Sequence, residues 1–203
     1  MKTNTVSDKV VVVTPIYDAF PEIISSLICQ THTNWELLLI DDNQSSKRTQ
    51  NIVATVNDNR IKHIPRPRFD AKMYGHPHRQ WALQQMKKDR LATDANYVLI
   101  TNADNYYLPN YLTAMIAGFA NPNIIATYCA SMLHSYVSWK LISCRLALGH
   151  IDCGGVIIRK EVACDTGWRS FEHSSDWTYF SDILLKHPSP KWAKIEGTLF
   201  VHN

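Results

Sequence analysis

Polar side chains that could do chemistry follow three short apolar runs of the sequence. They are Thr14 and Tyr17 after VVVV, Asp41 and Asp42 after LLLI, and Asn102, Asp104 and Asn105 after YVLIT. Hard cations such as Mg²⁺ and Mn²⁺ bind one or two carboxylates together with substrate phosphates. Asp104 is therefore a candidate metal ligand in a site that binds a phosphorylated substrate.

Local sequence leaves a simpler role open for these acids. An Asp in a turn between a strand and a helix is more often a helix cap than a metal ligand, and this applies to Asp104 and to Asp42. Neither GxGxxG nor GxxxxGK[ST] occurs at these turns, so neither a dinucleotide site nor a P-loop is indicated. Phosphates bound here would need a cation to neutralise them.

Alternating strands and helices would position these residues over the first 120 positions. Apolar runs predict strands, and apolar residues at helical spacing predict the helices between them. The predicted elements are strand 10–14 ended by Pro15, a helix from Pro21, strand 37–40, a helix over KRTQNIVATV, strand RIKHI, a loop over 65–77, helix 81–91, strand 97–101 and a helix from near Pro109. This order predicts an α/β fold with an open, mostly parallel sheet and helices on both faces. Ligands bind such sheets at the carboxyl ends of the strands, where strand order reverses.

The remaining third of the chain is less regular. The stretch NIIATYCASML fits a strand or a buried helix, GGVIIRK predicts a strand, and SSDWTYFSDILLKH predicts a capped helix. No repeat or linker divides the chain, so we expect one domain over residues 1–203. We expect residues 1–120 to form a nucleotide-binding half and 121–203 an acceptor-side half. The ending GTLFVHN suggests a domain excised from a longer chain.

Composition excludes several classes of protein. Hydrophobic residues make up 45% of the chain and charged residues 19%, as in a folded domain. The formal net charge is +3 and the basic residues are scattered, which argues against a nucleic-acid partner. Five cysteines without CxxC spacing predict buried free thiols in a reducing compartment. No signal peptide or apolar run long enough to span a membrane is present, so a cytoplasmic location is expected.

The segment VVVVTPIYDAFPEIISSLICQTHTNWELLLIDDNQS resembles the opening of the GT-A glycosyltransferases of family 2. That opening combines a strand, a Thr/Pro/Tyr loop, a helix ending in Gln-Thr, and a strand ending in Asp-Asp and Asn or Gly before Ser. The resemblance covers nearly the whole chain and implies a Rossmann-like GT-A fold. The chain is particularly similar to members of the spore-coat type, and the resemblance points to a viral glycosyltransferase or the first domain of one, in a host cytoplasm.

The resemblance implies a nucleotide site that prefers uridine. Thr14, Pro15 and Tyr17 would line the base pocket, and Asp42 would accept a hydrogen bond from the uracil ring. Arg79, in GHPHRQWALQQ, falls where the family places a basic residue near the nucleotide. A solvated surface arginine is the alternative for Arg79 and is about equally common.

The stretch TNADNYYLPNYL resembles the D-x-D segment that binds a metal in the family, but it departs from that pattern. Asn102 and Ala103 stand where an acid would be expected, which leaves Asp104 as the carboxylate ligand for Mn²⁺ or Mg²⁺. His202 lies where some GT-A enzymes place a histidine in the metal shell. A lone histidine is more often not a ligand.

A third stretch, HIDCGGVIIRKEVACDTGWRSFEHSSDWTYF, is similar to the acceptor-side segment of the family. The resemblance makes Asp176 the candidate catalytic base, with Glu172 as the alternative. Capping of the following helix by Ser174, Ser175 or Asp176 is equally compatible with the local sequence. Asp152 would contact the donor sugar or support its loop. Of the aromatic residues, Trp168 and Trp177 would either stack on a sugar or belong to the core.

The resemblance implies an inverting, metal-dependent transfer of a sugar from a UDP-sugar donor to a hydroxyl of a glycan or glycoconjugate. Two other functions stay open. A nucleotidyltransferase would also combine an α/β sheet, a metal and a nucleotide, but TPIYDAF lacks the glycine-rich loop that such an enzyme normally uses. The second open function is that of a module that binds sugar nucleotides or glycans without catalysis. It stays open because Asn102 and Ala103 replace the expected acid.

Overall fold

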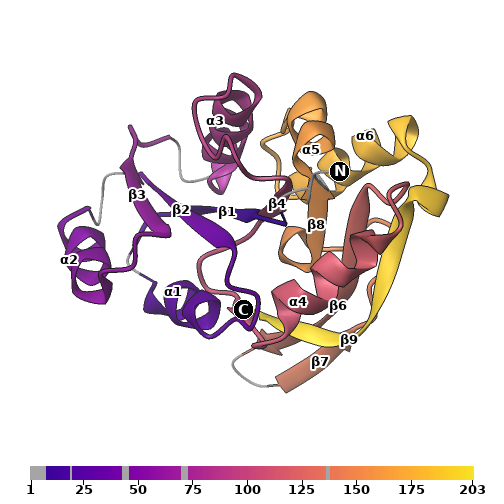
Figure 1. Cartoon of the computed structure of the whole chain (residues 1–203), viewed down its shortest axis with the longest axis horizontal. Coiled ribbons are helices and arrows are strands. Elements are labelled where there is room, and N and C mark those ends of the chain that lie inside the picture. Colours follow the sequence, from indigo (N-terminus) through magenta and orange to yellow (C-terminus); the bar gives the residue numbers. More distant parts are fainter. Residues whose placement is uncertain (1–7, 19, 43–45, 70–72, 136–137) are drawn as a thin grey trace, which may run out of the picture.

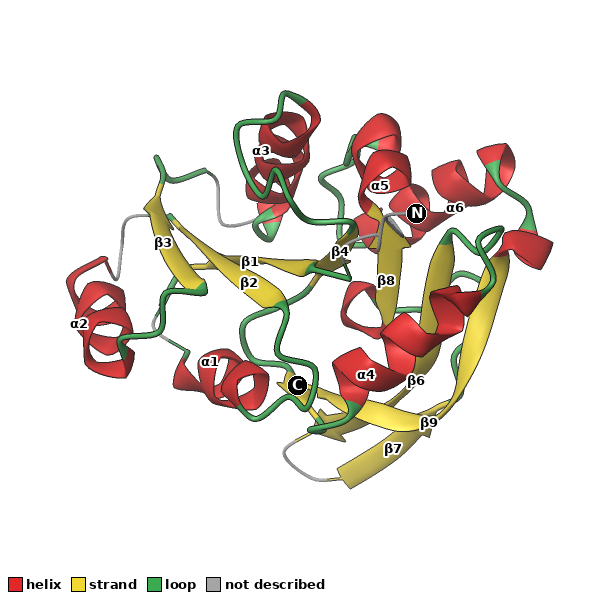
Figure 2. Ribbon diagram, viewed as in Figure 1, coloured by secondary structure: helices red, strands yellow, loops and turns green. Residues whose placement is uncertain are grey.

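The computed structural model describes residues 8–18, 20–42, 46–69, 73–135 and 138–203. Across these residues one nine-stranded sheet runs through the molecule, in the order β3-β2-β1-β4-β8-β6-β9-β5, with β7 paired to β6 (Figure 1). Helices cover both faces of this sheet (Figure 2). The predicted class of an α/β fold is therefore correct.

The first half of the chain forms the parallel part of the sheet. Its elements are β1 (Val10–Ile16), α1 (Pro21–Ile28), β2 (Trp35–Asp41), α2 (Ser46–Val56), β3 (Ile61–Pro65), α3 (His76–Lys87) and β4 (Tyr97–Ile100). β1 pairs in parallel with β2 on one side and with β4 on the other. Strand order therefore reverses between β1 and β4, which is where such sheets bind ligands.

Two predicted boundaries in this half were wrong. Pro15 does not end the first strand but lies inside it, beyond Val13, where pairing with β4 stops. α3 starts at His76, earlier than the predicted Trp81, and Pro77 belongs to its first turn instead of the loop. Proline suits that position, since a first-turn residue needs no intrahelical N–H bond.

The second half adds antiparallel strands. Its elements are β5 (Tyr106–Tyr107), α4 (Tyr111–Ala117), β6 (Ala126–Ser135), β7 (Ser138–Ile142), β8 (Val156–Arg159), α5 (Lys160–Thr166), α6 (Ser175–Lys186), β9 (Trp192–His202) and 3-10 helices at 118–120, 153–155 and 189–191. The stretch NIIATYCASML, which fits either a strand or a buried helix by sequence, contributes most of strand β6. β8 runs antiparallel to both β4 and β6, and β9 runs parallel to β6.

The core has two layers, one on each face of the sheet. Val11 and Val13 pack with buried residues of α3, α5 and α6, whereas Val10 and Val12 pack with those of α1 and α4. Because both faces are covered, alternation of apolar and polar residues is lost, which accounts for the unbroken run of valines.

All five cysteines are free, and four are buried, but Cys29 is exposed, so that part of the prediction was wrong. Cys29 is the residue that ends α1, and its side chain faces solvent rather than the sheet. Among the described residues, no helix is both long and apolar enough to cross a bilayer.

Candidate active site

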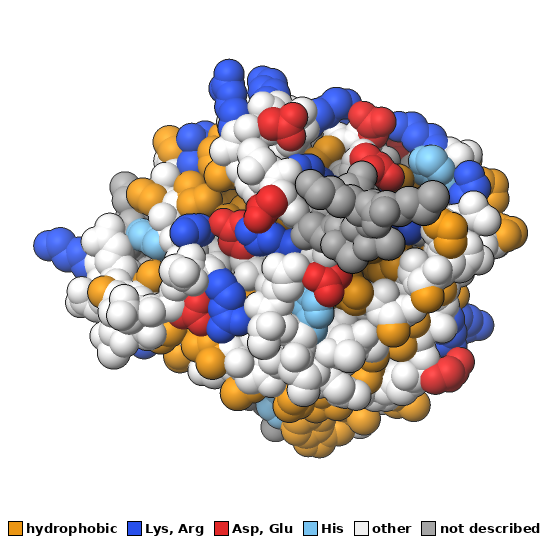
Figure 3. Space-filling model, in the orientation of Figure 1, with side chains coloured by type: hydrophobic (Ala, Val, Ile, Leu, Met, Phe, Trp, Pro, Cys, Tyr) orange, Lys and Arg blue, Asp and Glu red, His pale blue; other side chains and the backbone are white. Residues whose placement is uncertain are grey.

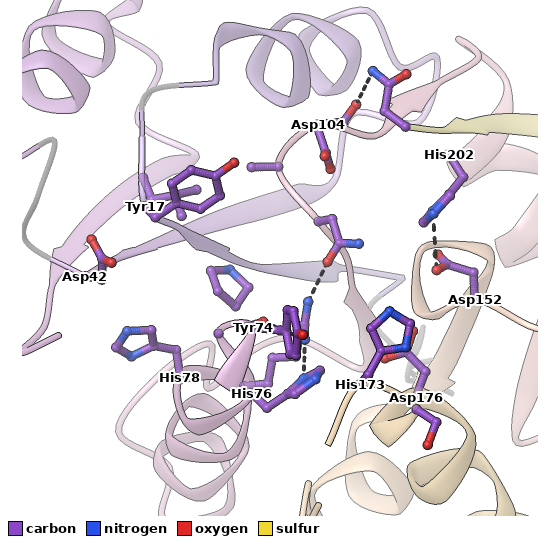
Figure 4. Close-up of a pocket in the computed structure, with 18 of the residues that line it drawn as sticks. Tyr17, Asp42, Tyr74, His76, His78, Asp104, Asp152, His173, Asp176 and His202 are labelled. Carbon is purple, nitrogen blue, oxygen red and sulfur yellow. Dashed lines mark hydrogen bonds and ion pairs between the residues drawn. The ribbon is translucent and has the colours of Figure 1, made fainter. Parts of the chain in front are cut away.

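A cleft of about 810 Å³ opens at the carboxyl ends of β1, β2 and β4. It brings together most of the side chains singled out in the sequence, from segments far apart in the chain (Figure 4). They are Pro15, Tyr17, Asp42, Arg79, Asn102, Ala103, Asp104, Asp152, Asp176, Trp177 and His202.

Five of the residues singled out in the sequence lie outside the cleft lining, and two of these, Asp41 and Asn105, are fully buried. Thr14 is fully buried and paired opposite Leu39 within the sheet, because β1 continues two residues beyond it. Trp168 is a core residue that stacks on Tyr179. Glu172 is exposed at the surface and is not among the residues that line the cleft.

Adjacent aspartates after β2 have opposite surroundings. Asp41 is fully buried and forms an ion pair of 2.8 Å with His63. Asp42 lies in the cleft wall, where its N–H donates to the carbonyl of Ile16 and its carboxylate is 3.9 Å from Nε of Arg68. Successive side chains of a strand point to opposite sides, which separates the two roles. Of the two acids, Asp42 is therefore the one that lines the cleft.

Arg79 is a buried cation with neutral partners. Its side chain is only 4% exposed, so the surface alternative is wrong. Nη2 donates to Oδ1 of Asn102 at 2.5 Å, and Nη1 donates to the carbonyl of Tyr74 and to Nδ1 of His76. Burial, and secondarily the charge of Arg79, lowers the pKa of His76 to about 3. His76 is thus neutral at physiological pH and does not compensate the guanidinium charge, whose electrostatic interaction is with the carboxylate of Asp176.

A glycine positions this arginine. Gly75 precedes α3 with φ of +73°, a conformation that favours glycine. A Cβ at this position would lie 2.7 Å from Cβ of Pro15. Only glycine therefore lets the start of α3 approach β1 closely enough to place Arg79 beside Asn102.

Asp104 has the properties of a metal ligand. Its carboxylate is half-buried, and Oδ1 is buried without a hydrogen-bond partner. Burial raises the pKa of this group. A buried carboxylate oxygen that no protein donor satisfies fits a hard divalent cation, which takes oxygen ligands.

His202 lines the same cleft as Asp104 and faces Asp152. Nδ1 of His202 lies 3.4 Å from Oδ2 of Asp152, and this carboxylate raises the pKa of His202. Metal-binding histidines commonly direct one ring nitrogen to a carboxylate and leave the other for the metal. The pair of His202 and Asp152 fits that arrangement, and Asp104 lines the same cleft (Figure 4). Among the described residues, the acidic and thiol groups close enough together to share an ion are those of Asp152, Cys153 and Asp176.

Asp176 does not cap its helix. It lies in the first turn of α6, and Ser174 at the N-cap makes no side-chain capping bond. Oδ2 of Asp176 instead accepts a hydrogen bond of 3.1 Å from the N–H of Cys153. Burial, followed by the negative charge of Asp152, raises the pKa of Asp176. The capping alternative is wrong for Asp176, which is held as an acceptor facing the cleft.

The sequence reasoning missed several residues that line the cleft. They are Tyr74, His76, His78, Leu148, His173 and Asn203, among others. The GHPHR stretch at the start of α3 was the available signal for two of these histidines. Asn203 could not have been found, because its role depends on a 3.1 Å hydrogen bond to the carbonyl of Asp104, 99 residues earlier.

Comparisons with known proteins agree with this geometry. A sequence model of glycosyl transferase family 2 matches residues 11–180. No curated protein matches the sequence significantly. The structure of residues 1–349 of S. aureus TarS with UDP superposes with a TM-score of 0.74 at 16% identity, covering 96% of this chain and 60% of that one. The same protein with UDP-GlcNAc gives a TM-score of 0.73 at 16% identity, covering 96% and 58%.

The shared architecture confirms the predicted family resemblance and fold class. The chain spans about 60% of the length of the TarS structure that it matches. At this level of identity the likeness establishes the fold, and the roles of individual cleft residues stay predictions.

Proposed function

The chain belongs to glycosyl transferase family 2, and on that premise we propose that it transfers a sugar from a UDP-sugar to an acceptor hydroxyl with inversion at the anomeric carbon. One observation carries the proposal: an unsatisfied carboxylate oxygen of Asp104, the buried guanidinium of Arg79 and the acceptor carboxylate of Asp176 line one cleft. These groups match the needs of a nucleotide diphosphate donor and an attacking hydroxyl.

Pro15, Tyr17 and Asp42 would bind the nucleotide. The ring of Tyr17 is exposed at the cleft and packs edge-on against Phe20, with ring centroids 5.3 Å apart. Asp42 would accept a hydrogen bond from the N–H of uracil. The UDP and UDP-GlcNAc complexes of TarS support uridine as the base.

The diphosphate would lie between Asp104 and Arg79. A Mn²⁺ or Mg²⁺ ion bound by Asp104 and His202 would supply a positive charge that stabilises the departing UDP. Arg79 adds a fixed charge from the opposite wall, and the amide of Asn102 orients it without neutralising it. Because Ala103 carries no polar group, it leaves room for the diphosphate beside Asp104.

Asp176 would act as the general base. The N–H of Cys153 fixes one oxygen of its carboxylate, and the thiol of Cys153 also hydrogen-bonds to this group, which would hold the carboxylate in place for the acceptor hydroxyl. Asp152 raises the pKa of Asp176 and so strengthens it as a proton acceptor. As Asp176 takes the proton, the acceptor oxygen attacks the anomeric carbon from the face opposite the diphosphate. Trp177 and Asp152 would hold the transferred sugar between them.

Calorimetric binding tests this proposal. UDP, GDP and several UDP-sugars are titrated into the protein with Mn²⁺ and with EDTA. We expect UDP to bind more tightly than GDP, and more tightly with Mn²⁺ than with EDTA. Absence of nucleotide binding under both conditions would remove the basis of the proposal. Nucleotide binding without hydrolysis or transfer of any UDP-sugar would favour the binding module, which the loss of the first acid of the motif leaves open.

A further inference from the structure

Apolar side chains are exposed along the segment that leads into the cleft. Trp139, Leu141 and Leu148 are 62%, 57% and 62% exposed. We call these three side chains the apolar strip. Figure 3 shows hydrophobic side chains gathered at the lower edge of the molecule, where Figure 1 places β7.

The strip belongs to a strand whose two faces differ. Trp139 and Leu141 are two residues apart in β7 and share one face, while Ser138 and Lys140 occupy the other. Both faces are exposed, and an exposed sheet face is usually polar. The apolar face of β7 is therefore available to a ligand.

The strip is linked to the cleft by side-chain contacts at one end of β7 and by the chain at the other. At one end Trp139 pairs with His134, and their rings lie 4.4 Å apart. His134 is 2.8 Å from the side-chain oxygen of Asn203, which lines the cleft. At the other end the chain runs from β7 directly into the loop containing Leu148, which also lines the cleft.

We infer that the acceptor is amphiphilic, with its reacting hydroxyl near Asp176 and an apolar portion on the strip. This inference rests on the proposed function, which places the acceptor on this side of the cleft. A sugar alone could stack on the ring of Trp139. It would gain little from Leu141 and Leu148, because aliphatic side chains offer its hydroxyls no hydrogen bonds. An alkyl or polyprenyl-like group would cover all three side chains and remove their area from water.

Paired glycosides test the inference. Octyl and methyl β-glycosides of glucose, galactose and N-acetylglucosamine are titrated, below micelle-forming concentrations, into protein saturated with UDP and Mn²⁺. We expect the octyl form of at least one sugar to bind about tenfold or more tightly than its methyl form. Trp139→Ser with Leu141→Ser, and separately Leu148→Ser, should abolish that preference. Leu185→Ser is the matched control, since Leu185 is 83% exposed on α6 and does not belong to the strip.

Two results would overturn the inference. The first is equal or absent binding of octyl and methyl glycosides; the second is an octyl preference that survives in both strip variants. Binding to phosphatidylcholine vesicles that depends on the strip, without any octyl preference, would assign the strip to a membrane surface instead. The affinity for UDP, measured on the same proteins before the glycosides are added, separates the two proposals. Absence of UDP binding would overturn the proposed function, whereas UDP binding without an octyl preference would overturn only the inference.

Discussion

The amide oxygen of Asn102 lies 2.5 Å from Nη2 of Arg79, so a neutral side chain faces a buried guanidinium where the D-x-D segment would carry an acid. Under the proposed function, the protein would supply through Arg79 part of the positive charge offered to the diphosphate. Metal-free binding of UDP should therefore be measurable and should depend on Arg79.

Asn102→Asp would place a carboxylate against Arg79 and neutralise it. We expect the affinity for UDP in EDTA to fall about tenfold, while the affinity in Mn²⁺ rises because a second acid reaches the ion. Calorimetry under both conditions measures the change. Asn110→Asp, at an exposed position before α4, is the control and should leave both affinities unchanged. An unaltered affinity in EDTA would contradict the role of Arg79.

Asp104→Asn should remove metal-dependent UDP binding without harming the fold. Burial disfavours the charged carboxylate, so an amide of the same shape should leave the melting temperature unchanged or higher. The increase in melting temperature caused by Mn²⁺ with UDP should be lost. Asp165→Asn changes an exposed acid and should retain that increase. Metal-dependent binding that survives Asp104→Asn would show that another residue binds the ion.

Asp176→Asn should lower turnover by about 10²–10⁴-fold, the usual contribution of a general base, and leave UDP binding intact. Glu172→Gln should be close to wild type, because Glu172 is exposed outside the cleft lining. Release of UDP from a UDP-sugar, with and without acceptor, provides the assay. Comparable losses in both variants would reopen the assignment of the base.

The stability of the protein should decrease in acid because of His76. Its pKa is lowered to about 3 from an ordinary 6.5, so between these values the unfolded chain binds a proton that the folded chain does not. The free energy of unfolding should therefore fall as pH decreases from about 6.5 towards 3, by up to about 1.4 kcal/mol per pH unit. The free energy of unfolding, measured with urea at several pH values, should depend less steeply on pH in His76→Gln than in the control His150→Gln. Equal slopes in the two variants would exclude His76 as the cause.

Gly75→Ala should destabilise the protein by about 2–4 kcal/mol, through backbone strain and a clash with Pro15. Gly149→Ala isolates the strain: its φ is +74°, but a Cβ there would have nothing within 4 Å. Gly149→Ala should lower the free energy of unfolding by about 1 kcal/mol. Urea unfolding measures both, and similar losses would mean that the close approach to Pro15 is unimportant.

The parallel half of the fold could be predicted from sequence because burial on both faces leaves unbroken apolar runs, such as that of β1. β5, β7 and β9 were missed for the opposite reason. β5 has two residues, β7 is exposed, and β9 has a mixed pattern of burial. Such strands are specified by their partners more than by their own residues.

Two side chains of the same type can also lie in different parts of the fold, and the local sequence does not distinguish them. Trp168 is buried in the core, whereas Trp177 lines the cleft. The backbone partner of Asp176 is Cys153, on a separate turn, so its position depends on tertiary packing. Many residues of the cleft could be listed from the sequence, but others such as Asn203, and the contacts of all of them, could not.

β9 is the last strand in the chain, yet it lies between β6 and β5 in the sheet. His202, the last residue of β9, and Asn203, which follows it, complete the surroundings of Asp104. During synthesis on a ribosome, β5 must therefore wait for β9 to emerge, and the nucleotide-binding strands can pair long before the cleft is closed. Such distant pairing makes folding slow and leaves a sheet edge open to other chains meanwhile. A nascent chain of this protein should therefore keep that edge unpaired until β9 has left the ribosome.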